Sequence, residues 1–257
     1  MVVPVWLSAV AWIALALGVI SAAAIVIDMM VNRPPMMPVM RAVWPVTALY
    51  MGPLAVWAYW KMQRRPAPAG AASRSHSSMA AGPGAQAINA HSTQRLHEDG
   101  DPKPTGGEGR PLWQAVFVGA THCGAGCTLG DILAEAAVAV LGVTIAGLAI
   151  WPEFIGDYAA AYVLGIAFQY FSIAPMRGLS LRKGIAAAVK ADTLSLTAFE
   201  VGLFGWMALN AFFFFHHQLH PDSAVYWLLM QVGMLLGFAT SYPMNWLLIR
   251  RGIKERM

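Results

Sequence analysis

Long apolar stretches separated by short polar ones predict membrane-spanning helices. The first runs from Val5 to Ile27 and continues past the small residues 21–24, which predicts a retained helix rather than a cleaved leader. The second lies within residues 40–65 and contains Pro45 and Pro53. Membrane helices tolerate proline because neighbouring groups satisfy the freed carbonyls. Each stretch holds about the 20 apolar residues that cross the hydrocarbon core of a bilayer.

Four more apolar stretches follow in the second half of the chain, at 132–150, 158–176, 193–215 and 224–249. The polar sequence "WPEFIGD" separates the first of them from the second. The short apolar segment 112–121 is predicted to be re-entrant, interfacial or the start of the third helix. The pattern therefore predicts an all-α, polytopic bundle of six transmembrane helices.

Residues 66–110 differ from everything around them. They are rich in Ala, Gly, Ser and Pro and nearly free of large apolar side chains, so they cannot bury enough surface to offset the entropy of ordering. We expect a disordered cytoplasmic linker between the second and third helices. The predicted organisation is a two-helix hairpin at 1–65, the linker at 66–110 and a four-helix domain at 111–257.

Composition and charge also predict a membrane protein. Hydrophobic residues make up 58% of the chain and charged residues only 12%, well below the roughly 25% of soluble domains. With six spans and both termini in the cytoplasm, 15 of the 17 Lys and Arg residues fall inside. This positive-inside bias predicts a multi-pass protein of the bacterial inner membrane, with the lipid bilayer as its partner and no nucleic acid.

The sequence "THCGAGCTLGDILAE" holds both cysteines of the chain. In a helix, Cys123, Cys127, Asp131 and Glu135 lie four residues apart and share one stripe, which should face the bundle interior because charge is costly in hydrocarbon. Two thiolates on successive turns suit a soft ion, Cu(I) or Zn(II), and His122 could add a ligand. The predicted metal residues are His122, Cys123, Cys127 and Asp131, with Glu135 as a second-shell acceptor or proton carrier.

Two other interpretations of this motif stay open. Gly126 and Gly130 have the spacing that lets membrane helices approach closely, and buried cysteine often behaves as a small apolar residue, so the motif could serve packing alone. A Cys123–Cys127 dithiol could also perform redox chemistry. The cytoplasmic end of the third helix, where we place the motif, keeps thiols reduced.

Other candidate residues lie outside the motif. Glu200 is an isolated acid within a predicted span and could couple protons or pair with a polar neighbour. A soft-metal uptake site on the external side could use methionines of the first turn and histidines of the last, although methionine is also a common filler of apolar cores. These residues are Met36, Met37, Met40, His216 and His220.

The sequences "PVMRAVWPVTALYMGPLAVWAYW" and "HCGAGCTLGDILAE" resemble the bacterial membrane family catalogued as domain of unknown function 4396. His122, Cys123, Cys127 and Asp131 match its motif. The resemblance implies a membrane bundle with a cysteine motif and carries no established activity.

Three functions follow from the sequence. The first is the handling or transport of a soft metal ion, copper being favoured. The second is a non-catalytic structural or assembly factor within a membrane complex or homo-oligomer, and the third is a membrane dithiol redox protein. No nucleotide-binding loop, Ser/His/Asp set or haem-attachment motif occurs, so we do not expect an enzyme.

Overall fold

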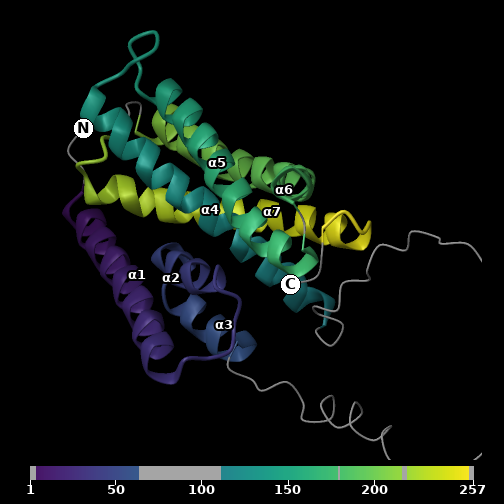
Figure 1. Cartoon of the computed structure of the whole chain (residues 1–257). Helices are drawn as coiled ribbons and strands as arrows, with labels where there is room; N and C mark the ends of the chain where they lie inside the picture. The colour runs from purple at the N-terminus through teal and green to yellow at the C-terminus, as the bar shows by residue number, and fades with distance from the viewer. Residues whose placement is uncertain (1–3, 64–110, 179, 216–218, 255–257) are drawn as a thin grey trace, which may run out of the picture.

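The computed structural model describes residues 4–63, 111–178, 180–215 and 219–254, and these residues are helical apart from short connections (Figure 1). The elements are α1 (Val5–Asn32), α2 (Met40–Met51), α3 (Pro53–Gln63), α4 (Leu112–Leu141), α5 (Ile150–Arg177), α6 (Leu181–Leu209) with a π-helical turn (Asn210–Phe214), and α7 (Ala224–Arg250). The predicted linker, 66–110, lies outside the described residues.

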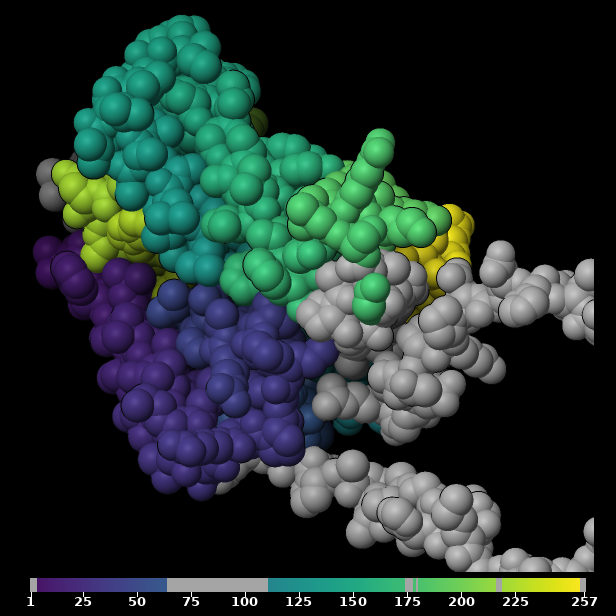
Figure 2. All heavy atoms as spheres, viewed as in Figure 1, coloured from purple at the N-terminus to yellow at the C-terminus, as the bar shows by residue number. Residues whose placement is uncertain are grey.

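Helices α4 to α7 form an up-and-down bundle, and α1 with α2 and α3 lies against one side of it (Figure 2). Small residues set the closest contacts within the bundle. A Cβ built on Gly126 would lie 2.8 Å from the Cα of Gly165, and one on Gly130 would overlap the backbone of Ala161. Gly202 and Gly237 bring α6 against α7 in the same way. The glycines of the motif therefore serve helix packing.

Four helices of the described chain are long and apolar enough to cross a membrane: α1, α4, α6 with its π turn, and α7. Large apolar side chains of α1, including Trp6, Ile13 and Ile20, are exposed on its surface. Such a surface suits contact with lipid rather than water. The protein is an all-helical membrane protein.

The second predicted span is two short helices that fold back on each other. Gly52, at φ 56°, ends α2 and Pro53 begins α3. Tyr59 of α3 packs against Trp44 of α2, with ring centroids 5.6 Å apart, and donates a hydrogen bond of 2.7 Å to Asp28 at the end of α1. At 12 and 11 residues, α2 and α3 reach only about 18 Å each, short of the roughly 30 Å of hydrocarbon. They form a re-entrant hairpin in place of the single, proline-containing span predicted within residues 40–65.

The hairpin changes the course of the chain. The Nζ of Lys61, near the end of α3, lies 5.7 Å from the ring of Trp113, near the start of α4, so the chain leaves the hairpin at the end of the bundle where α1 finishes. Helices α1 and α7 run parallel, because Leu7 and Ala11 pack near Val225 and Leu229 while Gly18 lies near Gln231. The beginnings of α1 and α7 meet at one side of Figure 1.

The start of α1 and the end of α7 lie at opposite ends of the bundle, whereas the predicted six-span arrangement brings both termini to one side. The bundle has two distinct ends. We call the end where α3 finishes and α4 begins the basic end, and the opposite one, where α4 finishes and α7 begins, the acidic end. All ten Lys and Arg residues among those described lie in the half of the molecule at the basic end. Arg33 and Arg41, the two exceptions in the six-span arrangement, are among them.

Helix α4 also differs from its prediction. It is continuous from Leu112 to Leu141, ends at Gly142 with φ 62°, and includes the segment 112–121 as its first three turns. The His-Cys motif therefore lies in the middle of a 30-residue helix rather than at its cytoplasmic end. Residues 151–157, predicted as a break, form the first turns of α5. In α4, the packing of the glycine-rich segment 119–130 inside the bundle outweighs the weak helix propensity of glycine.

Candidate functional site

One face of α4 carries a stripe of ionisable and thiol side chains into the bundle. His122, Cys123, Cys127 and Asp131 are completely buried, and Glu135 is 2% exposed. The i, i+4 spacing places the last four on successive turns of one face, as the sequence predicts. Both cysteines are free thiols. Three groups of partners surround the stripe at the basic end, the centre and the acidic end.

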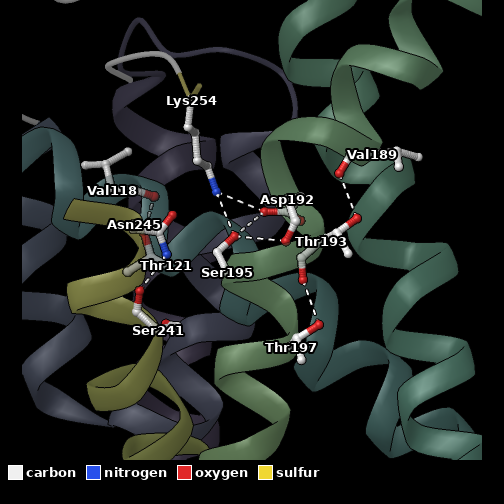
Figure 3. A network of polar contacts seen from close by, with 10 residues as sticks. All are labelled: Val118, Thr121, Val189, Asp192, Thr193, Ser195, Thr197, Ser241, Asn245 and Lys254. Carbon is white, nitrogen blue, oxygen red and sulfur yellow. Dashed lines mark hydrogen bonds and ion pairs between the residues drawn. The ribbon is translucent and has the colours of Figure 1, made fainter. Parts of the chain in front are cut away.

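At the basic end, a buried ion pair closes the bundle (Figure 3). Lys254, just beyond α7, turns back so that its Nζ lies 2.9 Å from Oδ1 of Asp192 on α6 and 3.3 Å from the hydroxyl of Ser195. The Ser195 hydroxyl lies 2.8 Å from the same carboxylate oxygen. The side chains of Lys254 and Asp192 are fully excluded from solvent. Such a pair is held by mutual compensation, because either charge alone would be costly at this depth.

His122 adjoins this ion pair and interacts electrostatically with both Asp192 and Lys254. Its ring packs edge-on against Phe168 of α5, with centroids 6.0 Å apart. Neither ring nitrogen has hydrogen-bonding geometry to a described group. His122 therefore links the cysteine motif to the basic-end network rather than pairing with the thiols in a compact cluster.

At the centre, the two thiols face each other and Glu200. Cys127 lies within interaction range of Cys123, of Glu200 on α6 and of Asp131. Neither oxygen of Asp131 nor of Glu200 is geometrically placed in a regular hydrogen bond with a described group. The hairpin reaches this point as well. A Cβ on Gly124 would lie 2.9 Å from the hydroxyl of Tyr50, which interacts with both cysteines.

At the acidic end, a narrow cavity opens between α4, α5, α6 and α7. Its polar lining includes Glu135, Glu153, Asp157, Asn210 and Tyr226, and the rest of the wall is apolar. Oε2 of Glu135, Oδ1 of Asp157 and the hydroxyl of Tyr226 are buried, and Glu135 contacts both Asp157 and Tyr226 outside regular hydrogen-bond geometry. Three acids thus line the end that carries no Lys or Arg within the described ranges.

The three groups follow one another along α4, whose buried residues include His122, Cys123, Cys127, Asp131 and Glu135 in that order. Asp131 has electrostatic interactions with Glu200, Asp157 and Glu135, and Glu135 in turn with Tyr226 and Asp157. With Cys127 joining Asp131 to Cys123, ionisable neighbours run from the basic-end ion pair to the acidic cavity. We call this series the polar column. Its members are Lys254, Asp192, His122, Cys123, Cys127, Glu200, Asp131, Glu135, Asp157, Tyr226 and Glu153.

The structure separates the residues predicted for external metal uptake. Met36, Met37 and Met40 lie between α1 and α2 at the basic end, where Met40 is buried and the other two pack on the core. His220 lies at the acidic end beside the cavity residue Glu153. These methionines and His220 therefore cannot form one site, because the re-entrant hairpin keeps the α1–α2 connection at the other end. His216 lies outside the described residues.

Several members of the column could not be identified from the motif. Asp192 and Lys254 lie near the ends of apolar stretches, and Glu153 and Asp157 lie in the polar sequence "WPEFIGD", where charged residues are expected in any membrane protein. A signal existed for the two acids: Glu153 and Asp157 are four residues apart, as on one face of a helix. Tyr50 had no comparable signal, because its role depends on how the hairpin folds.

The column is extended rather than gathered at one point. No three His, Cys, Asp or Glu side chains in the described part of the chain are grouped closely enough to hold one metal ion. The two thiols offer two ligands to an ion and do not need a group of three. Thiolates select soft cations such as Cu(I) and Zn(II), whereas the carboxylates of the column suit protons or harder cations.

Residues 112–254, more than half of the chain, match the sequence model of a family described as Domain of unknown function (DUF4396). The chain belongs to this family. The matched region begins with α4 and ends at Lys254, so it contains every member of the polar column, whereas Tyr50 and the hairpin precede it. No curated protein and no solved structure gives a significant match to the chain.

Proposed function

We propose that the protein translocates a soft metal cation, Cu(I) being favoured, through the bundle α4–α7 along the polar column. The observation that carries the proposal is a series of buried acids and thiols that runs between the two ends of a membrane bundle. Ionisable groups inside a bilayer are costly and commonly mark ion or proton paths. Packing accounts for the glycines of the motif, but it gives no reason for several acids buried close together without a cation beside them among the described residues.

The thiols and the acids have different roles in this proposal. Cys123 and Cys127, in mid-bundle, hold the soft cation while it crosses the least polar part of the path. Binding to thiols releases protons, and neighbouring carboxylates can receive them. Glu200 and Asp131 are the acids closest to the thiol pair. Glu135 and Asp157 continue the proton path to the acidic cavity.

Uptake of Ag(I), a redox-inert soft cation, into proteoliposomes tests the proposal. We expect the double variant Cys123→Ser/Cys127→Ser to reduce the initial rate by about tenfold or more, because hydroxyls are poor ligands for soft cations. Ala125→Ser is the matched control, since it adds a hydroxyl to the same buried helix and keeps both thiols. Equal uptake by wild type and the double variant would refute transport through this site.

The orientation proposed here is that of an inner-membrane protein with its basic end in the cytoplasm. The Lys and Arg residues support this side through the positive-inside rule. A reporter attached after Arg110 should then be cytoplasmic, and one attached before Val5 external. Two reporters on the same side would contradict the re-entrant hairpin and restore the six-span arrangement.

A further inference from the structure

A second cavity adjoins the thiol pair, on the side where the hairpin meets the bundle. It encloses about 490 Å³ between α1, the tip of the hairpin, α4 and α7. Its lining includes Tyr50 from the hairpin, Thr128 from α4, and Met230, Gln231 and Met234 from α7. This space differs from the acidic cavity, because no carboxylate belongs to its lining.

The two methionines give this space its chemistry. Met230 and Met234 are one helical turn apart, both are buried, and both line the cavity. The hydroxyl of Thr128 lies 3.7 Å from the sulfur of Met234 and donates a weak hydrogen bond to it. Thioethers bind soft cations without losing a proton, so this pair needs no base nearby.

The cavity lies next to the thiols. Thr128 follows Cys127 directly in α4, and Tyr50 both lines the cavity and interacts with Cys123 and Cys127. The Tyr50 side chain is buried, and the contact of its hydroxyl with Thr47 falls outside regular hydrogen-bond geometry. It is therefore a weakly bonded polar group that lies between two pairs of soft ligands.

The tip of the hairpin is fixed where it meets this cavity. Gln231 donates a hydrogen bond of 2.7 Å to the carbonyl oxygen of Leu49, in the last turn of α2. Gly18 of α1 allows the same carbonyl to approach closely. These contacts hold Tyr50 beside the thiols, and they use residues from outside the matched region 112–254.

The geometry points to a second soft-cation site, formed by the thioethers of Met230 and Met234 with the hydroxyl of Tyr50, from which a cation passes to Cys123 and Cys127. This inference rests on the proposed function and adds a ligand set to it. The thioether pair would take a soft monovalent cation in its uncharged surroundings. Transfer to the thiols would exchange neutral thioether ligands for anionic thiolates, which hold such a cation more strongly.

Silver binding to purified protein in detergent tests this site. After free Ag(I) is removed, wild type should retain about two ions per chain, one at each sulfur pair. Met230→Leu/Met234→Leu, a nearly volume-conserving change, should retain about one. Cys123→Ser/Cys127→Ser should also retain about one, and the combination of both changes about none. Met62→Leu, a buried methionine at the basic end, is the control and should bind as wild type.

The outcomes separate the two proposals. A methionine variant that binds as much silver as wild type would overturn the second site and leave the cysteine site intact. A cysteine variant that binds as wild type would overturn the proposed function. X-ray absorption at the selenium edge of selenomethionine protein with bound Ag(I) needs no substitution in α7. It should show a silver neighbour for part of the selenium, and its absence would overturn the second site even if the leucine variant failed to fold.

Discussion

The two ends of the polar column differ in how their buried charges are balanced. At the basic end, Lys254 and Asp192 form an ion pair, and Ser195 adds hydrogen bonds to it. At the acidic end, Glu135 and Asp157 face a cavity and have no Lys or Arg in that half of the described structure. The first arrangement resembles a structural element, whereas the second leaves capacity for a ligand or a proton.

The buried charges at the two ends should therefore affect the stability of the bundle differently. A balanced buried pair contributes little net stability, yet breaking it is costly because one charge is left alone. Acids buried close together without a cation already cost stability, so removing one should relieve the fold. Substitutions at the two ends should therefore act in opposite directions.

The largest effect should follow from Lys254→Met. It leaves Asp192 buried without its partner, and we expect the free energy of unfolding in detergent to fall by about 3–5 kcal/mol. Adding Asp192→Asn should restore most of the loss, because the unpaired charge is then gone. Lys190→Met, an exposed lysine of the same helix as Asp192, is the control and should change stability little. An equal loss in the double variant would show that Lys254 acts through packing alone.

A smaller effect of opposite sign should follow from Asp157→Asn at the acidic end. Because Asp157 is buried among the acids Glu135, Glu153 and Glu200, the neutral amide should remove like-charge repulsion and raise the free energy of unfolding by about 1 kcal/mol. Asp28→Asn is the contrasting control, since Asp28 accepts hydrogen bonds from Tyr59 and Asn32 and should lose stability. Chemical unfolding of both variants in one detergent measures the difference. A loss at Asp157 would mean that its carboxylate is compensated after all.

The smallest effects concern two tyrosines of the hairpin. Tyr50→Phe removes a hydroxyl whose contact with Thr47 falls outside regular hydrogen-bond geometry, and it should change the free energy of unfolding by less than about 0.5 kcal/mol. Tyr59→Phe removes the donor to Asp28 and should cost about 1–1.5 kcal/mol. If Tyr50→Phe proved the more damaging, its hydroxyl would be bonded in the folded protein, and its place between the two soft-ligand pairs would lose support.

The hydropathy pattern predicts much of the fold. The main error of that prediction arises at one dipeptide, Gly52–Pro53. The apolar stretches correctly predict α1, α6 and α7, because each is a continuous run of sufficient length. Pro53 is compatible with a kinked span, but Gly52–Pro53 is also a turn signal. Hydropathy cannot separate a kinked span from a re-entrant hairpin, because both bury the same residues. The distinction depends on contacts such as that between Tyr59 and Asp28.

The candidate site could be predicted only along α4. The spacing from Cys123 to Glu135 identifies one buried face, since a regular helix relates those positions by geometry alone. Other elements bring three more side chains into the same interior: Asp192, Lys254 and Tyr50. Their positions depend on how the helices pack, which one sequence does not reveal. Met230 and Met234 have helical spacing but look like ordinary core residues until the cavity beside them is seen.

The uneven distribution of charge makes the membrane voltage relevant to how this protein works. In the proposed orientation, all described Lys and Arg residues lie on the side of the membrane that is negative in a living bacterium. A monovalent cation that moves inward along the column gains about 2.3 kcal/mol for every 100 mV of membrane potential. Inward transport of such an ion could therefore be driven by the membrane voltage without a nucleotide, whereas export would have to do work against that voltage.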